Sequence, residues 1–298
     1  MNKKLQSSIL LVLATVIWGS AFAAQSAGMD YIQPFTFQAI RCFLAVPALL
    51  PVIFLFDGKN RTQFLRKWGD ARLWIAGGAC GAALFAAVNL QQVGLLYTSA
   101  GKGGFLTAMY IILVPFLGLF LKRKPSIMAF IGVIVAVIGM YLLSCVGVSQ
   151  INIGDIFMLL CAFAFAVQIT IVDYFASRVD NLRLNCIQCL VCALLSGIFM
   201  FTAESPQIDG ILNCWFPLCY TGILSMGVAY SLQIVGQKHM EPTAASIFMS
   251  LESVFAVLSG WLFLGERMTL WESLGCMLVF LAVILSQLPI EKVRIRKK

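Results

Sequence analysis

Ten apolar runs, each about as long as the hydrocarbon core of a bilayer is thick, make up most of the 298-residue chain. A helix needs about 20 apolar residues to cross roughly 30 Å of hydrocarbon. Charged residues are only 11% of the chain, against about 25% in soluble domains. The sequence therefore predicts an all-α integral membrane protein with ten transmembrane helices. The predicted spans are 7–27, 34–56, 73–95, 99–121, 126–146, 153–174, 184–203, 211–236, 242–264 and 270–288, the long eighth run having room for a kink or a tilt.

The basic residues lie almost entirely on alternate connectors between these runs. If the N-terminus is inside, 18 of the 21 Lys and Arg residues fall on the inner side of the membrane. Cytoplasmic loops carry such an excess of positive charge, so both termini are predicted to be cytoplasmic and the protein to lie in the cytoplasmic membrane of a prokaryote. The net charge of +8 thus reflects orientation in the membrane, and no nucleic-acid partner is expected.

The start of the chain also resembles a cleavable secretory leader. It has the basic residues of MNKK, an apolar stretch, and the sequence AFA at 21–23, which fits the small-residue pattern of a cleavage site. The apolar stretch is long for a leader, and nine more spans follow. An uncleaved first helix is therefore the favoured interpretation.

Two stretches in opposite halves of the chain share one pattern: YTSAGKGGFLTAMYIILVPFLGLFLKRKP at 97–125 and EPTAASIFMSLESVFAVLSGWLFLGERMT at 241–269. Each begins with small residues, becomes apolar and ends in an aromatic-Leu run followed by charge. This predicts two five-helix repeats, 1–146 and 147–298, the second ending in a basic cytoplasmic tail. Because five is odd, the second repeat would be inverted in the membrane, as in many transporters. Chance similarity between Leu-rich spans is the alternative.

Three segments carry a resemblance to a known family: WGSAF at 18–22, YTSAGKGGF at 97–105 and QKHMEPTAASIFMSLESVFAVLSGWLFLGE at 237–266. They resemble the EamA-type family of the drug/metabolite transporter superfamily. The resemblance implies two inverted five-helix repeats that move small metabolites by alternating access, without naming the substrate. The sequence departs from the family pattern at Ser253, where a proline is usual, which puts in doubt the kink that a proline would cause.

The strongest candidate for substrate binding or coupling is Glu252, near the middle of the ninth span. An ionisable group at that depth costs about 2.5–3.5 kcal/mol on insertion scales, so it needs a partner or a function. We expect Glu252 to couple transport to protons or to bind substrate. The alternative is a structural ion pair or hydrogen bond between helices.

Two basic residues inside the spans are further candidates. Lys102, within AGKGG, can attract an anionic substrate or can extend its ammonium group to the outer headgroups. Arg41 can bind an anion through two N–H groups. A structural pair with an acid near the outer face is the favoured interpretation for Arg41. The acids considered are Asp30, Asp155 and Glu272.

Uncharged polar and aromatic residues in both halves form a looser set of candidates. Such groups should face a cavity or another helix, because lipid offers them no hydrogen bonds. Trp18 is expected to form a wall of the cavity, with Gly19 and Ser20 allowing close helix contact; packing or contact with lipid is its alternative. For the others the ordinary alternative is a hydrogen bond between helices. The set is Trp18, Asn89, Gln92, Tyr110, Gln168, Tyr230 and Gln233.

No cofactor or metal is predicted. Cys186, Cys189 and Cys192 form C-x-x-C-x-x-C, but an iron–sulfur cluster needs four thiolates, and buried cysteine ordinarily behaves as a small hydrophobe. The chain also contains no nucleotide-binding motif. The energy for transport must then come from a gradient or from the substrate itself.

The combined prediction is a secondary active transporter, not an enzyme, for a small polar or amphipathic metabolite. Its expected partners are that metabolite, the lipid bilayer and, as a hypothesis, protons; export is favoured by the resemblance alone. One alternative is a membrane-embedded lipid-modifying enzyme, which would need sets of His, Asp or Glu near an interface, whereas the chain has one histidine. The other is a non-transporting receptor or scaffold, which leaves the repeat unexplained.

Overall fold

The computed structural model describes the whole chain except residues 1–2, 59, 121–125, 145–151, 265–268 and 288–298. Every regular element in the described part is a helix. The helices are α1 (Lys3–Gly28), α2 (Pro34–Phe56), α3 (Arg61–Lys67), α4 (Ala71–Gly94), α5 (Ala100–Thr107), α6 (Tyr110–Phe120), α7 (Ile127–Ser144), α8 (Ile153–Phe175), α9 (Asn181–Ala203), α10 (Ile208–Asn213), α11 (Trp215–Cys219), the π-helix η1 (Tyr220–Ala229), α12 (Tyr230–Gln237), α13 (Pro242–Met249), α14 (Leu251–Leu264) and α15 (Leu270–Gln287).

The apolar helices are long enough to account for most of the predicted spans. By length and composition, eight helical segments of the described chain are able to cross a membrane. Two shorter apolar stretches, Ile127–Leu142 and Ser273–Ser286, lie where the fifth and tenth spans were expected. The all-helical membrane fold is thus confirmed, with eight full-length candidate spans among the described residues; the count of ten stays a prediction.

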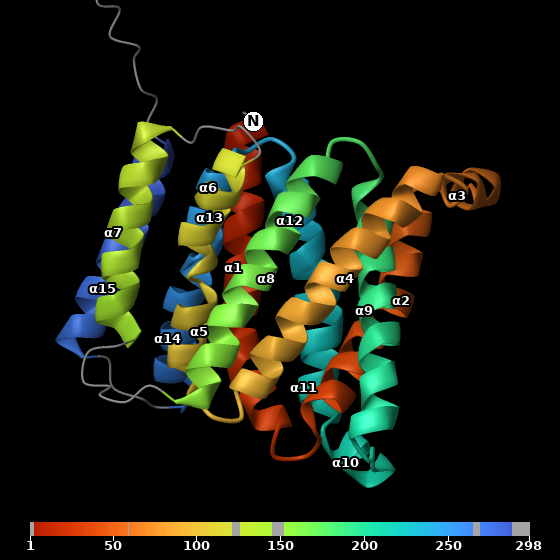
Figure 1. Ribbon diagram of the computed structural model, residues 1–298. Helices are drawn as coiled ribbons and strands as arrows, with labels where there is room; N and C mark the ends of the chain where they lie inside the picture. Colours follow the sequence, from red (N-terminus) through yellow and green to blue (C-terminus); the bar gives the residue numbers. More distant parts are fainter. Residues whose placement is uncertain (1–2, 59, 121–125, 145–151, 265–268, 288–298) are drawn as a thin grey trace, which may run out of the picture.

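The long helices stand side by side (Figure 1), with the α7 and α15 pair at one edge of the molecule and α3 and α10 at the other. Helix α1 starts at the end of the molecule where the N-terminus is marked, whereas α8 starts at the opposite end. Helices α7 and α15 approach closely because Gly139 has no side chain. A Cβ atom there would lie 2.8 Å from the Cβ of Leu278 and 2.9 Å from the carbonyl oxygen of Gly275.

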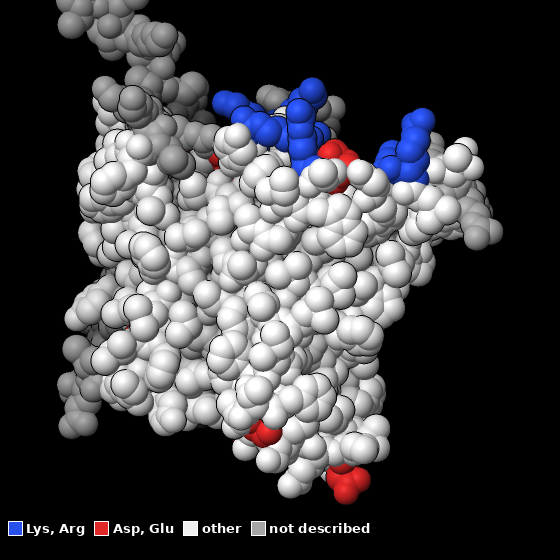
Figure 2. Space-filling model, turned by 45° about the vertical axis from the view of Figure 1, so that its right-hand side comes forward, with Lys and Arg blue, Asp and Glu red and all other residues white. Residues whose placement is uncertain are grey.

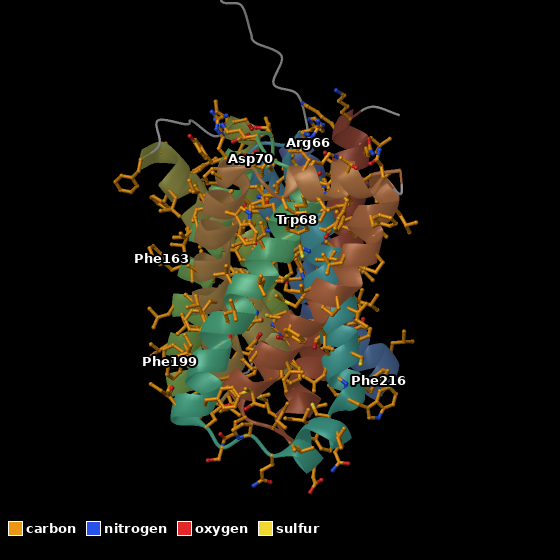
Figure 3. All side chains as sticks on the ribbon, turned by 90° about the vertical axis from the view of Figure 1, so that its right-hand side faces the viewer. Arg66, Trp68, Asp70, Phe163, Phe199 and Phe216 are labelled. Carbon is orange, nitrogen blue, oxygen red and sulfur yellow. The ribbon has the colours of Figure 1, made fainter. Side chains whose placement is uncertain are left out.

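The outer surface matches a protein surrounded by lipid. Figure 2 shows an uncharged belt across the middle of one face, with Lys and Arg gathered at one end and acidic residues at both ends. In Figure 3 Phe163, Phe199 and Phe216 lie along the outside of the helices, and Arg66 and Asp70 lie at one end with Trp68 beside them. Aromatic rings near such a boundary are typical of the membrane–water interface.

Three of the apolar spans are not continuous α-helices. The fourth is divided into α5 and α6, the ninth into α13 and α14, and the eighth contains the ten-residue π-helix η1. The break in the ninth span needs no proline: the hydroxyl of Ser250 donates to the carbonyl of Ile247 (2.8 Å), and that of Ser253 donates to the carbonyl of Ser250 (2.7 Å). Serine hydroxyls that bond to the preceding turn bend helices, so Ser253 and Ser250 take part in an irregularity where the family usually has proline.

Candidate functional site

A cavity lies at the level of these breaks, between helices from both halves of the chain. It has about 30 Å³ of space open to the centre of a water-sized sphere, enough for one or two water molecules. The cavity is therefore contracted around its lining side chains. These are Trp18, Phe22, Gln25, Arg41, Gln91, Tyr110, Phe165, Ile169, Ser225, Tyr230, Gln233, Met249 and Glu252.

The two broken spans meet at this cavity through a direct hydrogen bond. Helices α5 and α13 are both eight residues long, and their starts are 142 positions apart, as are Tyr110 and Glu252. Tyr110 and Glu252 thus occupy the same position relative to the break in their own span. The hydroxyl of Tyr110 donates to a carboxyl oxygen of Glu252 over 3.0 Å, and Glu252 is only 6% exposed.

The guanidinium group of Arg41 is buried at the same cavity, with 2% of the residue exposed. Its Nε donates to Oε1 of Gln38 over 2.6 Å, and its carbon Cζ lies 5.6 Å from the centre of the Phe37 ring. The amide of Gln38 in turn donates to Gln92 over 3.0 Å. In the part of the chain that the structure describes, Arg41 has amide and aromatic neighbours but no carboxylate within ion-pair distance.

Asp155, one of the acids considered as an ion-pair partner of Arg41, does not pair with it. Asp155 accepts from Lys102 over 2.6 Å, because the cap of α8 brings Asp155 to the start of α5. Asp30 forms no ion pair with Arg41, and the side chain of Glu272 lies outside the described residues. Lys102 is 13% exposed at its side chain and does not line the cavity.

Aromatic rings form much of the cavity wall. Trp18 meets Tyr230 edge to face, with ring centres 5.0 Å apart, and Tyr110 meets Phe165 at 6.4 Å. The small residue next to Trp18 has the role expected for it: a Cβ atom on Gly19 would lie 2.5 Å from the Cβ of Phe255, so α1 and α14 are in close contact there.

Four of the predicted site residues lie away from the cavity lining, and each has polar partners. Lys102 pairs with Asp155 as above. The amide of Asn89 donates to the hydroxyl of Ser196 over 2.8 Å, and Gln92 donates to the carbonyl of Gln25 over 3.1 Å. Gln168 lies behind the lining residue Gln233, which donates to it over 3.3 Å.

The six other predicted residues line the cavity together. They are Trp18, Arg41, Tyr110, Tyr230, Gln233 and Glu252. The sequence analysis missed the lining residues Phe22, Gln25, Gln91, Phe165, Ile169, Ser225 and Met249. Only the polar ones among these carried a usable signal. Gln91 stands beside Gln92, and Gln25 lies in the last turn of the first apolar run.

The two ends of α2 are tied to α9 in a reciprocal way. Glu204, just after α9, accepts from the backbone N–H groups of Phe35 (2.8 Å) and Thr36 (2.7 Å) at the start of α2. Asp57, just after α2, pairs with Arg183 at the start of α9. These ties join helices from the two halves of the chain at both ends, so α2 and α9 are held together beside the cavity.

Asp57 belongs to an ion-pair cluster at the end of the candidate spans Pro34–Phe56 and Asn181–Ala203. Asp57 also accepts from Lys67 over 2.6 Å, and Arg183 donates to Asp180 over 3.1 Å. Burial by itself raises the pKa of Asp57, but hydrogen bonds from Arg183 and Lys67 outweigh that effect and hold the pKa below its ordinary value. The carboxylate is therefore fully charged near neutral pH.

Comparison with known proteins gives a consistent family. The chain is 32% identical over 296 residues to an uncharacterized transporter of Archaeoglobus fulgidus, covering 97% of this chain and 88% of that protein. It is 23% identical to the uncharacterized transporter YoaV of Bacillus subtilis, covering 93% and 94%. It is also 24% identical to a chloroplastic WAT1-related protein of Arabidopsis thaliana, covering 94% and 69%.

One solved crystal structure has the same fold. It superimposes with a TM-score of 0.77 at 16% sequence identity, covering 94% of this chain and 96% of that one. In addition, residues 6–145 and again residues 152–288 match the sequence pattern of the EamA-like transporter family. The chain is thus a multi-pass membrane protein that belongs to the EamA-like transporter family.

Proposed function

We propose that this protein is a secondary active transporter that exports a small polar or amphipathic metabolite by alternating access across the cytoplasmic membrane. One observation carries the proposal: two spans are broken at corresponding positions, and the residues after the breaks, Tyr110 and Glu252, meet at a cavity lined by polar and aromatic side chains. Interrupted helices at corresponding places in two halves are the mark of a substrate site in transporters.

The architecture that we propose has ten spans in two inverted repeats, 1–146 and 147–298, with both termini in the cytoplasm. The opposite directions of α1 and α8 support the inversion (Figure 1). The gathering of Lys and Arg at one end supports the orientation (Figure 2). The two shorter apolar stretches, Ile127–Leu142 and Ser273–Ser286, would be the fifth and tenth spans.

The contracted cavity fits one stage of such a cycle. Space for one or two water molecules is too small for a metabolite, so substrate entry requires the helices around the cavity to separate. The breaks after α5 and α13 and the π-helix η1 supply flexible points at the cavity itself. The tied α2 and α9 would move as a unit while the broken helices change shape.

Glu252 is the proposed coupling residue. A buried carboxylate without a counter-ion is costly, and protonation removes that cost. Within the described residues its side chain has one hydrogen-bond partner, the hydroxyl of Tyr110. Arg41 and Tyr230 share the cavity with it. We propose that Glu252 exchanges a proton for substrate as the cavity opens to each side in turn.

The relatives are named transporters, a class that typically does no catalysis, and this argues against the lipid-modifying enzyme. A receptor or scaffold would bind its ligand without moving it.

A transporter, an enzyme and a receptor can be distinguished by comparing metabolites inside and outside cells. The cells express the wild type, Glu252→Gln or the control Asp209→Asn, at equal membrane abundance. Asp209 is an exposed acid in α10.

We expect at least one compound to be depleted inside and enriched outside with the wild type and with Asp209→Asn, but not with Glu252→Gln. The same change in all three strains would remove Glu252 from the mechanism. Enrichment inside the wild-type cells would replace export by uptake. No change with any of them would count against metabolite transport.

A further inference from the structure

We propose that the transported compound is a small zwitterion, held at its anionic end by Arg41 and Trp18 and at its cationic end by Glu252. This inference rests on the proposed function and names the substrate class of that site. It follows from the polar atoms that the cavity leaves without partners.

Nine buried side-chain nitrogen or oxygen atoms have no hydrogen-bond partner in the described structure, and four of them belong to residues that line this one cavity. They are Nε1 of Trp18, Oε1 of Gln25, Nη1 of Arg41 and Oε1 of Gln233. An unsatisfied buried polar group costs about 1–3 kcal/mol, so a cluster of them at one cavity indicates groups that a ligand satisfies.

The unpartnered donors define an anionic end. Nη1 of Arg41 and Nε1 of Trp18 are both N–H donors without an acceptor in the described chain, and the guanidinium charge has no carboxylate partner there. A planar guanidinium group matches the two oxygens of a carboxylate. The amide of Gln38 is already bonded to Nε of Arg41, which holds the guanidinium group in position.

The unpartnered acceptors define a cationic end. Oε1 of Gln25 and Oε1 of Gln233 accept no hydrogen bond from the described chain. Glu252 supplies a carboxyl group whose one hydrogen-bond partner among the described residues is Tyr110. An ammonium group offers three donors and no acceptor, which fits two amide oxygens and a carboxylate.

Charge balance selects a zwitterion over a simple ion. Arg41 and Glu252 line the same cavity but form no ion pair with each other, although both are described. A simple cation would leave Arg41 unpaired, because a guanidinium group stays charged in proteins. A simple anion would leave Glu252 to be neutralised by a proton, whereas the proposed exchange of that proton for substrate needs a cationic group to take its place. Water would satisfy the hydrogen bonds but would bring no opposite charge to either group. A ligand with both charges satisfies both ends and keeps the cavity neutral.

The test is binding to the purified full-length protein in lipid nanodiscs, followed by thermal stability and by calorimetry. The probes are the twenty free amino acids, their α-methyl esters, which lose the charge of the α-carboxylate, and their α-N-acetyl derivatives, which lose the charge of the α-amine. We expect one or more free amino acids to bind, and either modification to weaken that binding at least about tenfold.

Variants assign the two ends. The Arg41→Gln variant should bind the free amino acid no more tightly than its methyl ester. The Glu252→Gln variant should bind the free amino acid no more tightly than its N-acetyl form. The controls Arg66→Gln and Asp209→Asn, both exposed and away from the cavity, should keep both preferences. A loss of preference is not a consequence of poor folding, and the comparison of probes on the wild type needs no variant.

The proposal is overturned if no free amino acid binds, or if esters and N-acetyl forms bind as tightly as the free compounds. Its failure is distinct from that of the proposed function. Binding of zwitterions without movement across vesicles would overturn transport and keep the ligand class. Suppose instead that the protein transports a singly charged or neutral compound and that no zwitterion competes with it. The transport function would then stand, and the proposed zwitterionic substrate would be wrong.

Discussion

At the scale of single residues, buried charges are the most informative feature of this protein. Hydrocarbon makes an ionisable side chain costly wherever it lies, so the sequence alone directs attention to Glu252, Arg41 and Lys102. It does not say which of them finds a partner. Lys102 reaches Asp155 at 2.6 Å, whereas Arg41 and Glu252 open onto the cavity. That difference depends on the position of the N-terminal cap of α8, which places Asp155 beside Lys102. The hydropathy of the sequence does not predict this position.

Glu252→Gln separates a functional role from a structural one. Glutamine keeps an oxygen that can accept from Tyr110 and removes a buried charge that has no counter-ion in the described chain. We expect the free energy of unfolding to stay unchanged or to rise by up to about 2 kcal/mol, while transport is lost. The measurement is thermal unfolding in detergent beside transport in cells. A loss of stability together with unchanged transport would make Glu252 structural.

Asp57→Asn tests the buried ion pair at the end of α2. The side chain of Arg183 is 1% exposed, and removing one partner of a buried pair costs about 3–5 kcal/mol. Asp180→Asn is the control, because Asp180 is 35% exposed and asparagine also caps helices; it should cost at most about 1 kcal/mol. Equal losses in the two variants, measured by thermal unfolding, would contradict this assignment.

The same pair should make stability depend on acid. Because the folded-state pKa of Asp57 lies below its ordinary value of 3.8, its contribution is complete above that value and is lost as the pH falls through the folded-state pKa. We therefore expect the melting temperatures of the wild type and Asp57→Asn to differ near pH 7 and to converge below about pH 4. A constant difference across that range would exclude the carboxylate as the cause.

At the scale of the elements, the existence of the apolar helices was predictable and their interruptions were not. A run of apolar residues must be helical in lipid, and this is enough to locate the helices. The break at Ser250 coincides with hydroxyl bonds to the preceding turn, which serine also forms without ending a helix. Likewise the long eighth run allowed a kink, but the sequence does not indicate the π-helix over Tyr220–Ala229. Within it, Gly222 packs closely on α2: a Cβ atom there would lie 2.8 Å from the carbonyl oxygen of Arg41.

Close packing of α7 on α15 gives a prediction at this scale. Gly139→Ala would place a Cβ atom 2.9 Å from the carbonyl oxygen of Gly275 and 2.8 Å from the Cβ of Leu278, and overpacking of this kind costs about 1–3 kcal/mol. Gly78→Ala in α4 is the matched control, because nothing lies within 4 Å of its added Cβ; it should leave stability unchanged or raise it by about 1 kcal/mol. Thermal unfolding of both variants checks the pair, and an equal effect would contradict the close contact.

At the scale of the whole molecule, the two halves of the chain contact each other through segments at corresponding positions. The broken spans meet at Tyr110 and Glu252, and α2 and α9 hold each other at both ends through Glu204 and Asp57. The similarity of 97–125 and 241–269 predicted a repeat. It did not reveal that equivalent residues touch at the centre, because contact across two halves follows from their arrangement in space.

The central claim is that this arrangement moves a compound through the cavity. The most direct measurement is counterflow in vesicles that contain the purified protein, using the compound that the metabolite comparison identifies. Labelled compound outside should accumulate in vesicles loaded with unlabelled compound, with saturable kinetics for the wild type and Asp209→Asn and none for Glu252→Gln. Binding of the compound to the wild type without counterflow would contradict alternating access and would make the protein a receptor.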